Sequence, residues 1–244
     1  HFGFGLVRTP SNFGTLGERP THPQLLDWLA LRFVEHGWSL KWLHRTILHS
    51  ATYQRSARFD QQNDAVDADN RLLWRMNRRR LEVEPWRDAM LAVSGNLDRA
   101  LGGVSQKLDE ETNRRRTLYG FVSRHKLNEL LRLFDFPDPN ITSDRRASTT
   151  VPLQQLFVLN SDFMTRQARS LALHLVRDVP AGGAARIRRA YELLFARAPT
   201  AEEVAVGVEF LDQVKMAGKA ESNLSGWEQY ALGLLASNEF TYID

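Results

Sequence analysis

Cysteine is absent from this chain of 244 residues. Structural disulfides, zinc sites with cysteine ligands and covalent attachment of haem through a C-x-x-C-H motif are therefore excluded within it. A domain without cysteine is stable under both oxidising and reducing conditions. The composition therefore does not indicate the compartment in which the protein works.

Long apolar runs and a strong charge of one sign are also absent. The longest apolar stretch, residues 151–159, is interrupted by Pro152 and two glutamines, and it is much shorter than the roughly 18 residues that a membrane helix needs. The formal net charge is only +3, which gives little support for nucleic-acid binding. Hydrophobic residues make up 43% and charged residues 25% of the chain, as in a globular protein with a sizeable core.

Motifs typical of common enzyme classes are missing as well. The sequence contains no G-x-S-x-G, Walker or dinucleotide-binding pattern. His44 and His49 lie about 140° apart around a helix, whereas metal-binding pairs on helices are spaced by three or four residues. The other histidines are scattered. The sequence therefore predicts no metal site and no cofactor bound by this chain itself.

Helical periodicity is the main pattern that the sequence does contain. Apolar residues recur at helical spacing, so we predict a mainly α fold: an irregular bundle of about eight or nine helices. Residues 1–20, rich in glycine, proline and aromatic residues, are predicted to form an irregular arm. Arg116–Arg124 is interpreted as a short strand or an extended segment, and residues 134–140 as a turn-rich loop.

Several residues mark helix ends. Capping boxes, in which two residues satisfy each other's unpaired backbone amides, are predicted at Thr21–Gln24, Thr200–Glu203 and Ser225–Glu228. Pro85 is expected in the first turn of a helix, where proline is tolerated. Further helix starts are predicted at Ser39, Asp69, Pro152 and Ser161, and helix ends at Gly37, Gly95 and Gly182–Gly183.

The chain is predicted to form one helical domain, residues 1–244. The glycine pair at 182–183 would set apart a three-helix subdomain, residues 184–244. The first residues are glycine and aromatic residues without an initial Met, which we interpret as an N-terminally truncated fragment of a longer protein. Trp28, Trp38 and Trp42 cluster around the first pair of helices and are predicted to pack in the core.

Two groups of charged residues have both a functional and a structural interpretation. Glu84 and Asp88 would share a helix face and suit acid–base chemistry, but salt bridges to nearby arginines (Arg87 and residues 78–80) are favoured. Four arginines would form a basic stripe if one helix spanned them, but a solvated face paired to acids is favoured. They are Arg71, Arg75, Arg78 and Arg79.

A proline-rich loop carries three side chains with oxygen atoms, Asp135, Asp138 and Asn140. Such groups bind Ca²⁺ or sugar hydroxyls. Their spacing is not that of an EF-hand, and the same residue types are common turn formers, so both interpretations stay open. Other polar groups are expected to contribute if this loop lines a binding pocket. They are Arg145, Arg146, Arg8, Asn12 and Arg19.

Longer sequence phrases carry a family resemblance. Residues 9–56, residues 69–95 (DNRLLWRMNRRRLEVEPWRDAMLAVSG), the loop FDFPDPN, the segment TTVPLQQLFVLNSDFM and the closing SNEFTYID together resemble the family called domain of unknown function 1553, or planctomycete-specific domain one. The resemblance covers nearly the whole chain in order. Pro85 departs from the family pattern, since a helix-favouring residue such as alanine is expected there.

The resemblance implies a context and no catalytic residues. Such domains usually lie at the C-terminal end of large exported proteins of the cell envelope. A companion domain of unknown function (1549) precedes them, often with a cytochrome-c-like domain that carries haem c. This context suggests redox chemistry or polysaccharide use.

Three functional hypotheses follow. The first is a non-catalytic helical interaction module. The second is a contribution to a carbohydrate-active site at a domain boundary. The third, nucleic-acid binding, is the least favoured. Exposed apolar surface would support the first, convergence of the loop and arginine residues in one pocket the second, and a basic face without acids the third.

Overall fold

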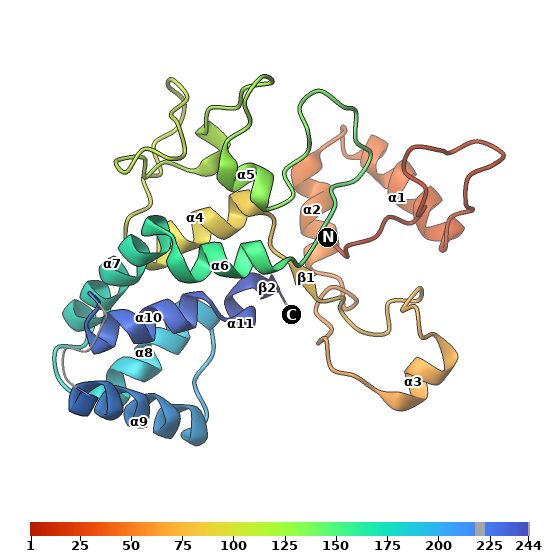
Figure 1. Cartoon of the computed structure of the whole chain (residues 1–244). Coiled ribbons are helices and arrows are strands. Elements are labelled where there is room, and N and C mark those ends of the chain that lie inside the picture. The colour runs from red at the N-terminus through yellow and green to blue at the C-terminus, as the bar shows by residue number, and fades with distance from the viewer. Residues whose placement is uncertain (218–222, 244) are drawn as a thin grey trace. The chain divides into compact units, whose positions relative to one another are not determined.

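The computed structural model describes residues 1–217 and 223–243, and within them the predicted mainly helical fold is confirmed (Figure 1). Helix accounts for 49% and strand for 3%, with 11 helices in the described part, 8 of them seven residues or longer. The strands β1 (Arg79–Arg80) and β2 (Tyr242–Ile243) pair as a two-stranded sheet. The helices are α1 (Pro23–Glu35), α2 (Leu40–Leu48), α3 (Gln61–Val66), α4 (Val83–Val93), α5 (Glu129–Leu133), α6 (Pro152–Asn160), α7 (Asp162–Asp178), α8 (Gly183–Phe195), α9 (Ala201–Ala217), α10 (Gly226–Leu235) and α11 (Asn238–Thr241), with a 3₁₀ turn, η1 (Thr117–Tyr119).

Contacts within the chain divide it into two compact units. The first unit comprises residues 1–79 with residue 243, and the second comprises residues 80–242. The division therefore follows Arg79, far from the glycine pair at 182–183. None of the described helices is both long and apolar enough to span a membrane.

The first pair of helices begins and ends close to the predicted residues. Ser39 caps α2 by accepting a hydrogen bond from the Trp42 amide at 3.2 Å, as predicted. Gly37 follows α1 with φ +64°, a left-handed conformation that favours glycine. The predicted Thr21–Gln24 capping box is wrong. His22 is the N-cap residue, and the Thr21 hydroxyl instead donates to the Leu6 carbonyl at 3.3 Å.

The helix predicted to start at Asp69 does not form. The Asp67 carboxylate accepts from the amides of Arg71 and Leu72 at 2.9 and 2.7 Å, and the bond from Leu72 lowers the pKa of Asp67. Leu73 has φ +57°, which a helix does not allow. Side-chain acceptors that bind nearby amides compete with helix formation in this way. The basic stripe of arginines, which was conditional on one helix spanning them, does not form, because no helix covers residues 71–79.

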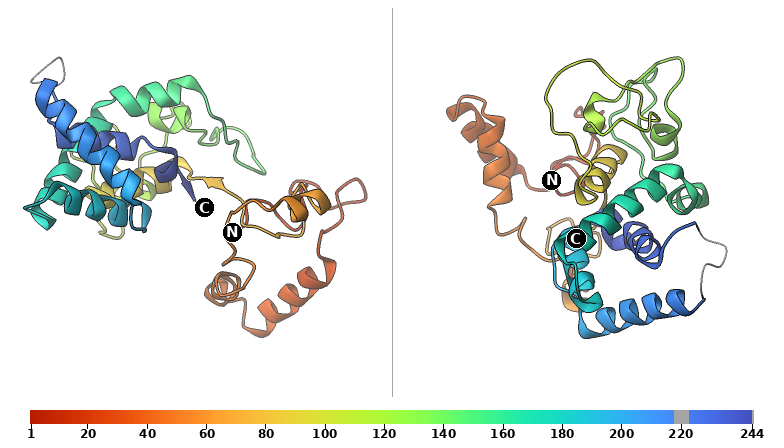
Figure 2. Two further views of the ribbon diagram at one scale, coloured as in Figure 1. Left: turned by 90° about the horizontal axis from the view of Figure 1, so that it is seen from below. Right: turned by 90° about the vertical axis from the view of Figure 1, so that its left-hand side faces the viewer.

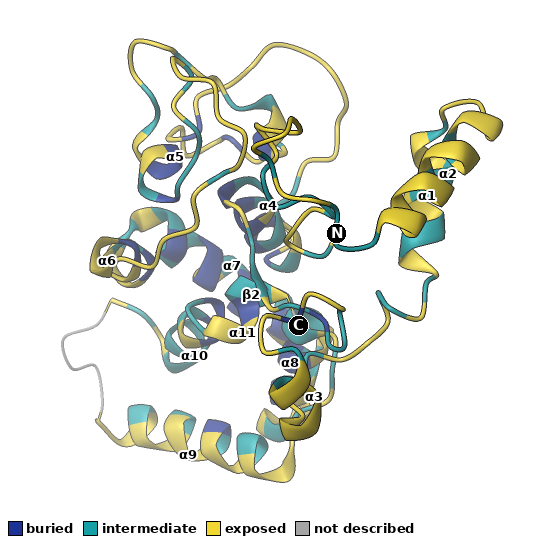
Figure 3. Cartoon of the chain, turned by 90° about the vertical axis from the view of Figure 1, so that its right-hand side faces the viewer, coloured by how far each residue is buried: buried dark blue, intermediate teal, exposed yellow. Residues whose placement is uncertain are grey.

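The first unit buries little apolar surface. Among the described residues 1–79, Met76, at 5% exposure, is the one apolar side chain in the buried class. The helices α1 and α2 contain no buried residue, and Figure 3 shows them largely exposed. Core packing was predicted for Trp28 and Trp38, but their exposed fractions are 45% and 66%, so that prediction is wrong for both. Trp42 is half-buried and stacks on His36 with ring centroids 4.1 Å apart.

The second unit contains an extensive core. The helix α10 packs along α7, and α8 packs against α9 (Figures 1 and 2). Trp86 of α4 is 2% exposed and stacks on Phe134, with ring centroids 4.6 Å apart. The buried apolar side chains of α7 follow helical spacing, as the sequence predicts. They are Met164, Ala168, Leu171, Ala172 and Leu175.

The helix boundaries of the second unit mostly agree with the sequence. Val83 begins α4, so Pro85 lies in its first turn, and Gly95 ends the helix with φ +76°. Pro152 is the first residue of α6, and the Ser161 hydroxyl accepts from the Met164 amide at the start of α7. These residues act locally, which is why their sequence signals suffice.

Two predicted capping boxes lie near the C-terminal helices. Thr200 and Glu203 form both bonds of the box, at 2.7 and 3.2 Å. Glu228 accepts from the Ser225 amide at 2.7 Å. The guanidinium of Arg197 also bonds to Glu203 and Glu239, tying the start of α9 to α11, and it lowers the pKa of Glu203 to about 2.

The segment between α4 and α6 is the least regular part of the second unit. Arg116–Arg124 does not form a strand: it contains the 3₁₀ turn η1 and then an extended residue, Gly120, that pairs with Gln106 in an isolated bridge. Of the two interpretations of residues 116–124, the extended segment therefore describes the structure better than the strand. The short helix α5, which the sequence did not predict, begins where the Asn128 side chain accepts from the Leu130 amide at 3.0 Å. Phe134–Asn140 is a loop, as predicted.

Candidate functional site

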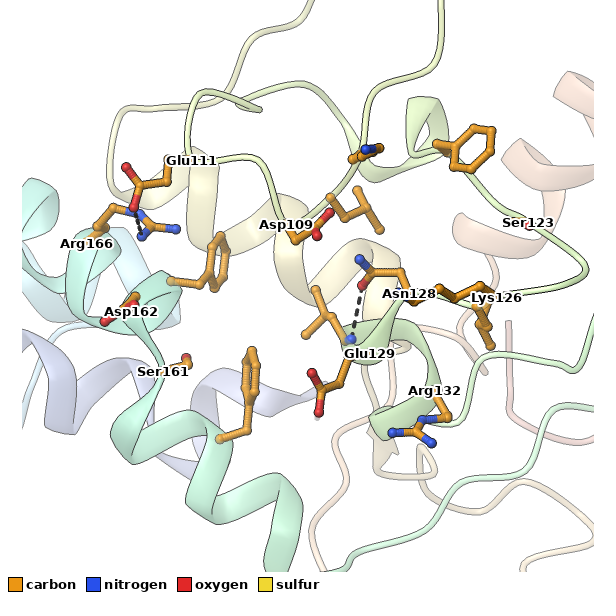
Figure 4. Close-up of a pocket in the computed structure, with 17 residues that line it drawn as sticks. Asp109, Glu111, Ser123, Lys126, Asn128, Glu129, Arg132, Ser161, Asp162 and Arg166 are labelled. Carbon is orange, nitrogen blue, oxygen red and sulfur yellow. Dashed lines mark hydrogen bonds and ion pairs between the residues drawn. The ribbon is translucent and has the colours of Figure 1, made fainter.

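The second unit contains an open hollow of about 960 Å³ (Figure 4). Its walls are the irregular segment 107–132, the end of α6 and the first turns of α7. We call it the hollow. The residues that line it are Lys107, Leu108, Asp109, Glu111, Phe121, Ser123, Lys126, Leu127, Asn128, Glu129, Leu130, Arg132, Phe157, Ser161, Asp162, Phe163 and Arg166.

Acidic and basic side chains are balanced around the hollow, and three phenylalanines line it with them. Arg166 and Glu111 form an ion pair at 3.1 Å, and Figure 4 shows Lys126 and Arg132 on the opposite side from this pair. Apolar surface ringed by hydrogen-bonding groups suits an uncharged, hydroxyl-rich ligand. The acids are Asp109, Glu111, Glu129 and Asp162, and the bases are Lys107, Lys126, Arg132 and Arg166.

Two polar side chains that line the hollow cap helices. The side-chain oxygen Oδ1 of Asn128 caps α5, and the Ser161 hydroxyl caps α7. Across the described residues, no group of three or more histidine or acidic side chains is placed to hold a metal ion.

A smaller recess of about 230 Å³ adjoins the hollow. The two share Leu108, Glu111, Phe163 and Arg166. We call it the recess. The other residues that line it are Arg87, Leu91, Asn96, Glu110, Asn113, Arg114, Gln167, Arg169 and Ser170.

Arg87 of α4 is a buried arginine beside the recess, with 1% exposure. Its guanidinium donates to the carbonyls of Asn113 and Arg115 at 2.8 and 3.0 Å and to the Thr117 hydroxyl at 3.2 Å. Burial lowers its pKa. These bonds hold the irregular segment against α4, so the shape of both cavities depends on them.

The polar side chains of the predicted binding loop form hydrogen bonds with other groups of the chain. The Asp135 carboxylate accepts from the amide and hydroxyl of Thr149, both at 2.8 Å. Asp138 and Asn140 bond to each other at 3.0 Å, and the Asn140 amide also donates to the Arg124 carbonyl. The turn-forming interpretation describes these contacts. None of the three residues is among those that line the hollow or the recess.

Glu84 and Asp88, the two acids considered for acid–base chemistry, each bond to other groups of the chain. Arg146 bonds to both oxygens of Glu84 at 2.7 and 2.8 Å and also to Glu82, and the bonds to Glu84 raise the pKa of Arg146. Asp88 accepts from the amide and hydroxyl of Thr117 at 2.6 and 2.7 Å. Glu84 does form a salt bridge, but with Arg146 and not with the nearby arginines that the spacing indicated, and Asp88 lies 3.7 Å from Arg116.

The remaining candidate residues are distributed over both units. Arg145 lies beside Arg146 in the second unit. Arg8, Asn12 and Arg19 belong to the first unit. Arg8 donates weakly to the Asp69 carbonyl at 3.4 Å, and the Asn12 side chain accepts from the Gly14 amide. Arg19 is exposed.

Sequence reasoning missed the residues of the hollow and the recess. Most of them lie in the segment 107–132, where no periodicity indicates which side chains face inward. One signal was present: Arg87 lies four residues after Val83 and three before Met90, both buried. A charged residue in phase with an apolar stripe predicts a buried charge with a specific set of partners.

Comparison with known proteins gives one match. The family model PSD1, described as "Protein of unknown function (DUF1553)", matches residues 1–211. No curated protein and no solved structure matches the chain. The matched residues include residues 1–79 of the first unit and all residues that line the hollow and the recess.

Proposed function

Because the chain belongs to the family of proteins of unknown function DUF1553, we propose that it is a non-catalytic interaction module of an exported multidomain protein. One observation carries the proposal. Residues 1–79 form the main part of the first unit, and Met76 is the one apolar residue among them whose side chain is buried. A domain of that size normally depends on a larger core for its stability. Apolar surface left in water on this scale is typical of an interface.

The proposed contact surface lies on the hairpin of α1 and α2. Four exposed apolar residues of α1 are spaced by three, so each lies about one turn from the next. Trp28 and Leu31 are central among them, with exposed fractions of 45% and 67%. Aromatic residues surrounded by aliphatic ones supply most of the binding energy in many interfaces. The four residues are Leu25, Trp28, Leu31 and Val34.

We propose that the partner is a neighbouring domain of the same protein, the companion domain of unknown function 1549. The family resemblance supports this choice, and it also supports a cell-envelope location and a nearby cytochrome-c-like domain that would carry haem c. In this arrangement the hairpin would hold the companion domain, and through it position the cytochrome or a polysaccharide.

Binding of the separately produced companion domain tests the proposal. We expect the variant Trp28→Ser/Leu31→Ser to bind it at least tenfold more weakly than the unchanged chain, because each lost anchor contributes on the order of 1–2 kcal/mol. Isothermal titration calorimetry measures the affinity. The matched control is Leu173→Ser, since Leu173 is also exposed, at 71%, but lies on α7. Equal affinities of the double variant and the unchanged chain would contradict the proposal.

A second candidate function is carbohydrate binding as part of a site shared with another domain. The hollow favours it, because balanced acids and bases beside Phe121 and Phe163 suit a ligand rich in hydroxyl groups. We expect neutral oligosaccharides to raise the melting temperature of the chain, and Phe121→Ala, an exposed position, to reduce the shift. An unchanged melting temperature across a panel of neutral oligosaccharides would exclude this function for the chain alone.

A further inference from the structure

One buried hydrogen-bond donor borders the recess without an acceptor among the described residues. It is the Nε of Arg87, which is inaccessible to water and has no hydrogen-bond partner. Gln167, a residue with 5% exposure, also lines the recess. The Oε1 of its side-chain amide accepts from the Ser94 hydroxyl at 2.7 Å and from the Asn96 amide at 3.0 Å. These two bonds fix the orientation of the Gln167 amide. Buried donors are rarely left unpaired.

The positive charge of Arg87 is not neutralised by a bonded carboxylate. Its hydrogen bonds go to two carbonyls and a hydroxyl. The carboxylate of the adjacent Asp88 accepts a hydrogen bond from the Thr117 hydroxyl, and its other oxygen lies 3.7 Å from the Nε of Arg116. A buried cation acts through a weakly polarisable interior, so its field at a neighbouring cavity is screened less than that of a surface charge.

The rim of the recess adds further positive charge. Arg114, Arg166 and Arg169 line it together with Arg87, against the two acids Glu110 and Glu111, and Glu111 is paired with Arg166. The hydroxyl of Ser170 is one more donor on the wall. The recess is therefore rich in donors and has an excess of positive charge, whereas the charges of the hollow are balanced.

We propose that the recess binds an oxyanion, namely a sulfate, phosphate or carboxylate group. Arginine side chains and amide donors are the groups that recognise such anions in proteins. The anion would accept from Gln167 Nε2 and from the arginines of the rim, and it would supply the counter-charge that Arg87 lacks. Because the recess opens beside the hollow through shared residues, an anion carried by a larger molecule would place the rest of that molecule in the hollow. This inference does not depend on the docking of α1 and α2.

The first test is calorimetric titration of the whole chain with sodium sulfate and sodium phosphate at constant ionic strength, with sodium chloride as the reference. We expect saturable binding of sulfate or phosphate and none of chloride. The variant Arg114→Gln/Arg169→Gln should bind at least tenfold more weakly. Its matched control is Arg99→Gln/Arg188→Gln, since both residues are exposed arginines of the second unit that line neither the recess nor the hollow.

A second variant tests the amide of Gln167. Gln167→Glu keeps an oxygen for Ser94 and Asn96 but replaces the Nε2 donor with a negative charge in the recess that Arg87 also lines. We expect it to abolish sulfate and phosphate binding while the circular dichroism spectrum stays that of the unchanged chain. Should sulfate and chloride give equal responses, or should the rim variant and its control bind alike, the proposal is overturned.

The source of the oxyanion is distinguished by a third titration. Galactose 6-sulfate and galactose are compared with inorganic sulfate. Tighter binding of the sulfated sugar than of either part assigns the recess to an anionic group on a larger ligand. Equal binding of the sulfated sugar and inorganic sulfate assigns it to the free ion. Either result supports an oxyanion site. Tighter binding of galactose than of galactose 6-sulfate and inorganic sulfate would contradict such a site.

Discussion

Replacing Trp86 with alanine is expected to lower the free energy of unfolding by about 3–5 kcal/mol, as for other large aromatic residues removed from a core. Trp86 is 2% exposed and stacks on Phe134, which in turn contacts Phe157 edge-to-face at 5.7 Å between ring centroids. The substitution removes the ring that joins α4 to the segment containing α5 and to α6, and the surrounding side chains can fill the space only in part. Urea denaturation followed by circular dichroism measures the change.

The matched control for this prediction is Trp38→Ala. Trp38 is 66% exposed, so the same change in side chain should cost less than about 1 kcal/mol. Trp86→Phe should fall between the two, because it keeps an aromatic ring against Phe134. Similar losses for Trp86→Ala and Trp38→Ala would show that Trp86 does not anchor the core.

Replacing Arg87 with methionine is expected to lower the free energy of unfolding by about 3 kcal/mol. Methionine removes the charge but leaves two carbonyls and one hydroxyl without their donor in a buried region, and hydrogen bonds to charged groups contribute about 1.5–3 kcal/mol each. Relief of the desolvation cost of the guanidinium offsets part of this loss. The segment 113–117 should also lose protection from amide hydrogen exchange.

Two further variants make the Arg87 prediction specific. Arg87→Lys retains the charge but cannot reach three acceptors with one ammonium group, so an intermediate loss is expected. Arg188→Met is the matched control, because Arg188 is exposed on α8. A stability equal to that of the unchanged chain in Arg87→Met, with the protection of residues 113–117 preserved, would mean that packing alone holds this segment.

Local sequence signals predicted most of the long helices and many of their ends. Ser39, Ser161 and the Thr200–Glu203 pair act within one helical turn, so their effect is visible in a few consecutive residues. One failure, the helix predicted to start at Asp69, is also local in cause. The Asp67 carboxylate accepts from the two amides that Asp69 would cap at the start of a helix, so a neighbouring acceptor replaces the predicted cap.

The sequence by itself determined the helical class, the family membership and the amphipathic stripes, because each of these is written in short-range periodicity or in contiguous phrases. Only the tertiary structure decided which apolar stripes pack against another element. The stripe of α7 is buried, whereas Trp28 and Leu31 of α1 are exposed. The tertiary structure also decided the candidate site. The partners of Arg87 lie 26 to 30 residues away in the chain, and contacts at that separation depend on the path of an irregular segment that carries no periodic signal.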